Sequence, residues 1–228
     1  RAQIIQNVSY SGLSKNKCKF LPHFIDTKNT QTAKNKPTSN TMKAKKVAKT
    51  GKKMLGCQGW GGAYTLDIYN PDVRAYIKKV FDTVLNVWGY DMVKLDFLYS
   101  QCVFPRNGKT RGQIMCEAMD FLRECVGDKL FLGCGVPLLP SFGVVDACRI
   151  SCDVDLTYKG KFYSRIQVSN EMLNARSAIN NSIFRRHLDG RVWMNDPDVF
   201  FLRKDNLTFT DEQKYLLGKI NNLCGNVL

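Results

Sequence analysis

The sequence lacks several features that would assign its function quickly. No stretch of about 18 consecutive apolar residues occurs, so the sequence predicts no membrane span. Residues 1–10 form a mixed segment without the long apolar run of a secretory signal peptide. No glycine fingerprint of the GxGxxG or Walker type follows a predicted strand, which argues against nucleotide binding.

The chain also lacks the spacings that mark a zinc site or a disulfide framework. It has nine cysteines, an odd number, with no CxxC pair, and only two histidines, His23 and His187. We therefore predict no metal site and reduced thiols in a reducing compartment, which favours a cytoplasmic protein. A start at Arg1 rather than Met suggests a fragment of a longer chain.

The positive charge is concentrated in one place. The net charge is +14, and residues 28–53 hold nine lysines and no acid, which leaves +5 for the rest of the chain. This lysine-rich window is poor in large apolar residues and predicts a solvated, flexible connector. A basic arm that binds an acidic polymer is the alternative, but the window lacks the aromatic and arginine side chains used in readout, so no nucleic-acid partner is expected.

Predicted strands and helices alternate along the remainder of the chain. Helix signals include Asn70-Pro71-Asp72, an N-cap followed by a first-turn proline, and the capping box Thr210 to Gln213. The predicted strands are 63–68, 92–99, 130–134, 147–152 and 191–195, and the predicted helices are about 71–88, 111–125, 169–187 and 211 onward. The alternation favours an α/β fold of the (β/α)8 TIM-barrel type with a parallel sheet. We predict three regions: a short N-terminal segment 1–27 with a possible early barrel strand, the lysine-rich segment 28–55, and a partial barrel over 56–228.

The strand predicted over 92–99 carries an unusual pair of charges. Val93, Leu95 and Phe97 alternate with Lys94 and Asp96, so a strand would place both charges on one face. Buried charges are rare unless they are paired or used, and Lys94 would favour the ionised form of Asp96. An ion pair on a partly exposed edge strand is the alternative.

Later strands also end in reactive or acidic side chains. Cys134, Asp153 and Asp196 each stand at or directly after the end of a predicted strand. In a parallel α/β barrel the chemistry lies at the carboxyl ends of the strands. Taken singly, Asp153 and Asp196 are equally compatible with helix capping.

Two carboxylates delivered by different strands suit glycoside hydrolysis. One attacks or stabilises the oxocarbenium-like centre, and the other, held protonated, donates to the leaving oxygen and then activates water. Lys94 suits Asp96 to the first role. Repulsion from Asp96 and Asp155 would keep Asp153 protonated for the second.

Four segments then resemble a known family. Residues 88–99 resemble the nucleophile strand of family 36 glycoside hydrolases, the α-galactosidases with relatives that act on α-N-acetylgalactosamine and on raffinose-type sugars. Residues 133–137 through 148–153 resemble the segment from that family's cysteine loop to its acid/base aspartate. Residues 184–187 and 191–200 resemble a later strand, whose Asn-Asp-Pro-Asp also occurs in family 27. The resemblance covers about residues 60–228.

The resemblance implies a site and a reaction. It implies a retaining double displacement on terminal α-galactosides of the raffinose or melibiose type, without metal or cofactor. The implied roles are Asp96 as nucleophile, Asp153 as general acid/base, Lys94 and Cys134 as sugar contacts, Arg149 as a neighbour of the acid/base, and Asp196 close to the pocket, as either a sugar contact or a loop-shaping residue. Trp60 is either an aromatic platform for the sugar or a core residue.

The chain also departs from that family. It lacks the Asp-Asp-Gly-Trp type motif that grips the galactose hydroxyls, and the lysine-rich window stands near that place. Residues 226–228 stop where the last strand should begin, so we expect an incomplete barrel without its first and last strands. Such a barrel leaves apolar faces open to association, for example as a homo-oligomer. The alternatives to an active α-galactosidase are a truncated, inactive relative and a related α-N-acetylgalactosaminidase.

Overall fold

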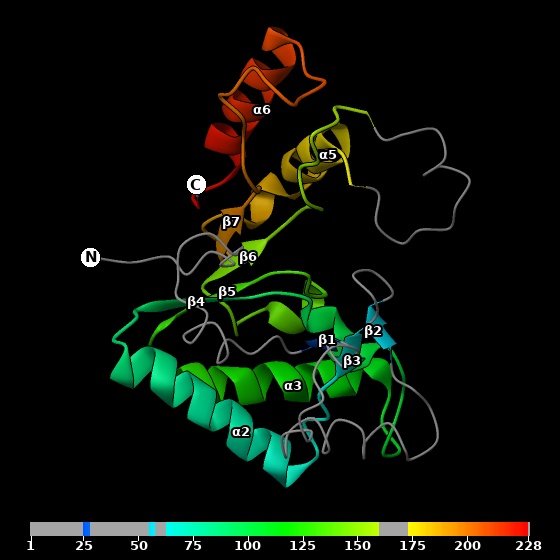
Figure 1. Ribbon diagram of the computed structural model, residues 1–228, viewed down its shortest axis with the longest axis vertical. Helices are drawn as coiled ribbons and strands as arrows, with labels where there is room; N and C mark the ends of the chain where they lie inside the picture. The colour runs from blue at the N-terminus through cyan, green and yellow to red at the C-terminus, as the bar shows by residue number, and fades with distance from the viewer. Residues whose placement is uncertain (1–24, 28–54, 58–62, 160–172, 228) are drawn as a thin grey trace, which may run out of the picture. The chain divides into compact units, whose positions relative to one another are not determined.

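The computed structural model describes residues 25–27, 55–57, 63–159 and 173–227 (Figure 1). The chain falls in two compact units, Arg1–Val144 and Val145–Leu228. Trp60 and the lysine-rich window 28–53 lie outside the described residues, so the predictions made for them stay predictions. Within the part of the chain that is described, no helix is both long enough and apolar enough to cross a membrane.

The first unit contains a small antiparallel sheet. Its strands are β1 (Ile25–Thr27), β2 (Leu55–Cys57) and β3 (Ala63–Thr65), in the order β1-β3-β2. Only five residues separate β2 from β3, too few for the crossover that a parallel pair requires, which explains the antiparallel pairing. The strand predicted over 63–68 is shorter than expected because Asp67 forms a turn, accepting from the Tyr69 amide (3.2 Å) through its side chain and from the Asn70 amide (3.0 Å) through its carbonyl.

The first long helix is α2 (Pro71–Asp82), which continues into the π-helical turn η2 (Thr83–Val87). The predicted cap is confirmed, since the Asn70 side chain accepts from the Asp72 amide at 2.9 Å. Trp88, expected on the buried face, is 40% exposed. The wider π turn shifts the residues that follow it out of phase with the buried face, so that prediction was wrong.

The first unit also contains a parallel strand pair, β4 (Met92–Leu95) and β5 (Leu130–Gly133). The connection carries the 3₁₀ turn η3 (Leu98–Cys102) and α3 (Arg111–Val126), whose capping box of Thr110 and Gln113 was not predicted. Figure 1 shows α2 and α3 side by side, and the Arg74 guanidinium lies 3.7 Å from the centre of the Phe121 ring. The strand predicted over 92–99 ends at Leu95, because Phe97 has a φ of +56° and the chain turns there.

The second unit repeats the strand-helix-strand pattern. Strands β6 (Ala147–Arg149) and β7 (Met194–Asp196) pair in parallel, and between them lies α5 (Ala175–Arg185), followed by the 3₁₀ turn η5 (Arg186–Leu188). The chain then enters α6 (Asp211–Cys224), where the predicted Thr210 capping box is confirmed. β6 begins where predicted but ends three residues short of the predicted range 147–152, and β7 begins three residues later and ends one residue later than the predicted range 191–195.

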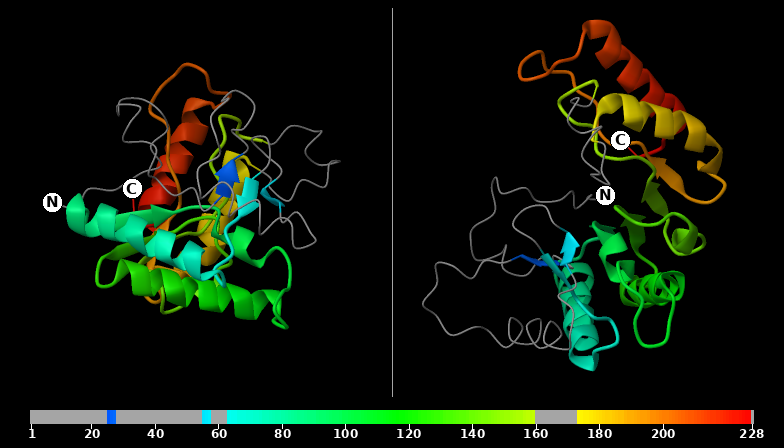
Figure 2. Two further views of the ribbon diagram at one scale, coloured as in Figure 1. Left: turned by 60° about the horizontal axis from the view of Figure 1, so that its bottom comes forward. Right: turned by 90° about the vertical axis from the view of Figure 1, so that its right-hand side faces the viewer.

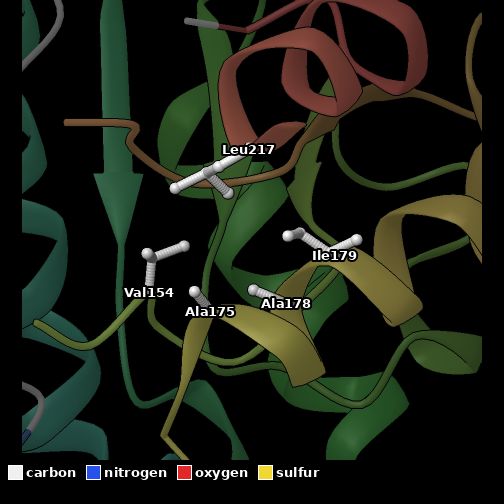
Figure 3. Close-up of a cluster of buried hydrophobic side chains, with 5 residues drawn as sticks. All are labelled: Val154, Ala175, Ala178, Ile179 and Leu217. Atoms are coloured by element: carbon white, nitrogen blue, oxygen red, sulfur yellow. The ribbon is translucent and has the colours of Figure 1, made fainter. Parts of the chain in front are cut away.

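Helices α5 and α6 pack against each other, as both views in Figure 2 show. Their shared core is drawn in Figure 3 and consists of Val154, Ala175, Ala178, Ile179 and Leu217. The predicted inward face of α6, Leu216, Ile220 and Leu223, was right for Ile220, which is partly buried against this core, and wrong for the two leucines, which are exposed. The buried residues of α6 are Leu217, Asn221 and Cys224. Asn221 explains this shift of the buried face. Its side-chain amide donates to the Asp198 carbonyl at 2.8 Å, and this hydrogen bond keeps a polar residue on the buried face of the helix.

These observations confirm the predicted α/β class. Four parallel strands, β4 to β7, alternate with helices, and two of the three connections between them carry α3 and α5. The division into 1–27, 28–55 and 56–228 stays a prediction.

Candidate active site

The carboxyl end of the β4–β5 pair holds three of the predicted site residues. Leu95 and Gly133 are register partners, so the residues that follow them, Asp96 and Cys134, stand next to each other at the same edge. The Cys134 amide donates to the Leu95 carbonyl at 2.8 Å, and Cys134 as a whole residue is 3% exposed. Lys94 is half-buried and lies opposite Leu132 in β5.

Asp96 is held through the backbone that follows it. The Phe97 amide donates to Asp96 Oδ1 at 2.6 Å, and Phe97 itself adopts a left-handed conformation. The Tyr99 amide donates to the Gly135 carbonyl at 2.8 Å, which ties this turn to the loop after β5. A non-glycine residue with positive φ is strained and persists only where its surroundings fix it, so the turn is a built feature of this edge.

Gly135 completes this arrangement. It has a φ of +52°, and a Cβ placed there would lie 2.9 Å from Asp96 Oδ1 and 2.9 Å from the Phe97 nitrogen. Only glycine permits both the conformation and the close approach. The sequence predicted no role for Gly135, although it lies in the segment 133–137, and the signal for such a role is that a glycine stands on each side of Cys134.

The carboxyl end of the β6–β7 pair is built around a buried arginine. The Arg149 guanidinium forms ion pairs with Asp153 (Nη1 to Oδ1, 3.0 Å), Asp196 (Nε to Oδ2, 3.0 Å) and Asp198 (Nη2 to Oδ1, 2.8 Å). The side chains of Asp196 and Asp198 are 7% and 8% exposed, whereas that of Asp153 is 69% exposed. One guanidinium therefore holds two buried carboxylates and presents a third to solvent.

Asp196 has the contacts of a loop-shaping residue. One carboxylate oxygen pairs with Arg149, and the other accepts from the Asp198 amide at 2.9 Å. Since both oxygens already have partners inside the protein, Asp196 suits the loop-shaping role better than the sugar contact.

Asp198, which the sequence did not single out, lies at the centre of this cluster. Its Oδ2 accepts from the Val154 amide at 2.7 Å while its Oδ1 pairs with Arg149. Burial raises the pKa of Asp198, and Arg149 opposes that rise. Burial also raises the pKa of the neighbouring Cys148 thiol to about 12, with Asp196 contributing, so that thiol stays neutral.

Asn195 anchors β7 from inside the second unit. It is fully buried, accepts from Trp193 Nε1 at 3.0 Å, and donates from Nδ2 to the carbonyls of Arg185 (3.3 Å) and Cys224 (3.1 Å). The Asn-Asp-Pro-Asp segment thus combines an asparagine that fixes the strand with two aspartates that fix Arg149.

Each parallel pair is thus followed by a predicted catalytic carboxylate that is not fully buried: Asp96, directly after β4, in one unit, and Asp153, four residues after the end of β6, in the other. Across residues 63–159 and 173–227, no group of three or more His, Cys, Asp or Glu side chains is placed to hold a metal ion. The chemistry available from these side chains is that of carboxylates, as nucleophile or as acid and base.

No protein-family model matches the chain. Among solved structures, two of the same α-galactosidase are similar to it. TtGalA, an α-galactosidase from Thermus thermophilus, solved with p-nitrophenyl α-D-galactopyranoside, is 28% identical with a TM-score of 0.67 over 77% of this chain. The same enzyme solved with stachyose is 29% identical with a TM-score of 0.62 over 73% of this chain. In both cases the match spans only 36% of the α-galactosidase chain. The chain is thus structurally similar to part of an α-galactosidase.

Proposed function

We propose that this chain carries the catalytic centre of a retaining α-galactosidase of the family 36 type, acting on terminal α-galactosides of raffinose-type or melibiose-type sugars. The observation that carries the proposal is the placement of one accessible carboxylate after the carboxyl end of each parallel strand pair. The similarity to an enzyme solved with two α-galactosides supports the substrate class.

In the proposed reaction Asp96 attacks the anomeric carbon and forms a covalent galactosyl ester. Asp153 donates a proton to the departing glycosidic oxygen, then takes one from the water that hydrolyses the ester. The Phe97 amide donates to Asp96 Oδ1 at 2.6 Å and so limits the rotation of the carboxylate. Lys94 and Cys134 contact the sugar, and Arg149 orients Asp153.

A second candidate is a relative that keeps both carboxylates but does not hydrolyse α-galactosides. The absence of an Asp-Asp-Gly-Trp type motif favours it, because galactose would lose contacts to its hydroxyls. An α-N-acetylgalactosaminidase is the third candidate. The cytoplasmic location and the homo-oligomer stay predictions.

The test is hydrolysis of p-nitrophenyl α-galactopyranoside by the purified chain and by its Asp96→Ala and Asp153→Ala variants. We expect each variant to lose activity by about 10²–10⁴-fold, in the range of removing a group that acts in the transition state. Asp128→Ala, which removes an exposed carboxylate in the turn after α3, is the matched control and should keep parent activity.

The outcomes separate the candidates. Equal rates in the parent and in both variants would contradict the assigned roles. A parent without activity on this substrate, but active on the α-N-acetylgalactosaminide, would identify the third candidate. Inactivity on both would favour the inactive relative.

A further inference from the structure

We propose that Asp198 is a positioning residue for Asp153, because its single carboxylate fixes both the arginine that holds Asp153 and the backbone directly after it. The catalytic consequence rests on the proposed function of Asp153. The positioning itself depends only on the contacts of Asp198 and has an experiment of its own.

The first route from Asp198 to Asp153 runs through Arg149. Asp198 Oδ1 lies 2.8 Å from Arg149 Nη2, and Arg149 Nη1 lies 3.0 Å from Asp153 Oδ1. The guanidinium is planar and rigid, so a partner that fixes one terminal nitrogen also fixes the direction of the other. Movement of the Asp198 carboxylate is therefore transmitted to the bond that Asp153 receives.

The second route runs through the main chain. Asp198 Oδ2 accepts from the amide of Val154, at 2.7 Å, and this amide belongs to the peptide bond that follows Asp153. Val154 is 7% exposed as a residue, and its side chain packs in the core of Figure 3. The backbone on the C-terminal side of Asp153 is thus held by Asp198 from one direction and by the core from the other.

Asp198 is itself well fixed, whereas Asp153 is not. The Asp198 amide donates to Asp196 Oδ1 (2.9 Å), and its carbonyl accepts from Asn221 in α6 (2.8 Å). The Asp153 side chain, by contrast, is 69% exposed. An exposed side chain has no packing to choose its rotamer. The direction of Asp153 therefore depends on Arg149, which Asp198 and Asp196 hold together, and on the following backbone amide, which Asp198 holds.

The chemistry of position 198 requires a carboxylate rather than an amide. Arg149 and the Val154 amide are both donors, and each meets a different oxygen of Asp198. An asparagine has one acceptor oxygen and one donor nitrogen, so one of the two contacts would become a donor facing a donor. Asparagine is nearly the same size as aspartate, so Asp198→Asn removes one of the two contacts without a large change in volume.

The structural arm of the test is amide hydrogen exchange, followed by NMR on the whole chain. The single acceptor oxygen of an asparagine should face Arg149, because a hydrogen bond to a charged donor is the stronger one, and the side-chain nitrogen then faces the Val154 amide. In Asp198→Asn we therefore expect the Val154 amide to exchange at least about tenfold faster while amides within α5 keep their parent rates. Asp205→Asn, an exposed aspartate in the loop before α6, makes the same charge change and should leave Val154 unaltered. If the variant does not fold, the parent decides: a Val154 amide that exchanges as fast as an exposed loop amide would overturn the proposal, and a protected one supports it.

The functional arm compares kcat/KM for two aryl α-galactosides. Asp198→Asn should lower the value for phenyl α-galactoside at least about tenfold more than for the 2,4-dinitrophenyl substrate, whose leaving group departs without a proton. Equal losses on both substrates would indicate a merely structural role and overturn the link to Asp153. If the parent hydrolyses neither substrate, the proposed function fails, while the exchange experiment still decides whether Asp198 positions Asp153.

Discussion

The two parallel strand pairs hold their terminal carboxylates in different ways. After β4, Asp96 is oriented by the amide of the next residue, by a left-handed turn and by the close approach of Gly135. After β6, Asp153 is oriented by a charge cluster in which Arg149 is shared with two buried aspartates. Backbone geometry is insensitive to pH but intolerant of added atoms, whereas a buried charge cluster tolerates small changes in shape but not the loss of a charge. Substitutions should therefore disturb Asp96 mainly through added atoms and Asp153 mainly through a lost charge.

The largest effect is expected from Arg149→Met, which removes the charge and keeps much of the side-chain volume. Asp196 and Asp198 would remain buried without their cationic partner, and breaking a buried ion pair from one side costs about 3–5 kcal/mol. Urea denaturation would measure the loss. Lys78→Met, which removes an exposed ion pair with Glu124, is the control and should change stability by less than about 1 kcal/mol.

The same variant has a pH signature. Burial already raises the pKa of Asp198 against the pull of Arg149, and removing Arg149 raises it further. The folded variant then binds a proton that the unfolded chain does not, so its stability should increase as the pH falls through that raised pKa. A stability deficit that is the same at pH 5 and pH 7.5 would argue against a charge-based cluster.

A smaller loss is expected from Gly135→Ala at the other end. The left-handed conformation of a non-glycine residue costs about 1–2 kcal/mol, and forcing in a methyl group adds about 1–3 kcal/mol, since its carbon would lie 2.9 Å from Asp96 Oδ1. Gly143→Ala is the matched control, because Gly143 has a φ of +72° but nothing within 4 Å of the added Cβ. Equal losses in the two variants, compared by denaturation midpoint, would show that the approach to Asp96 is not tight.

The smallest effect is expected at the helix N-terminal capping box, which occurs once in each unit. Thr110 in the first unit and Thr210 in the second each accept from the amide of a glutamine three residues later, at 3.3 Å. Thr→Ala at either position should destabilise by about 1 kcal/mol, and Thr→Ser should restore most of it. Thermal unfolding of the four variants checks this, and a clearly larger loss at one cap would show that the helix there depends more on its cap than on its packing.

Much of the fold could be predicted because its signals are local. The proline and asparagine at the start of α2 and the capping box of α6 each act within one helical turn, and both are confirmed. The predictions that failed depended on distant contacts. Trp88 is exposed because a π turn precedes it, and the buried face of α6 is set by the bond from Asn221 to Asp198.

The candidate site shows the same division. Alternation of strands and helices, with Asp96, Cys134 and Asp196 at or beside strand ends, was determined by the sequence, because hydrophobic periodicity and turn-forming residues act over a few positions of the chain. Asp153, predicted to follow a strand directly, lies four residues beyond the end of β6. That Asp198 joins Arg149 to Val154, and that Gly135 lies against Asp96, was decided only by tertiary structure. These contacts join residues about 40 or more positions apart, and a hydrogen bond or a steric limit acts across a few ångströms of space whatever the separation along the chain.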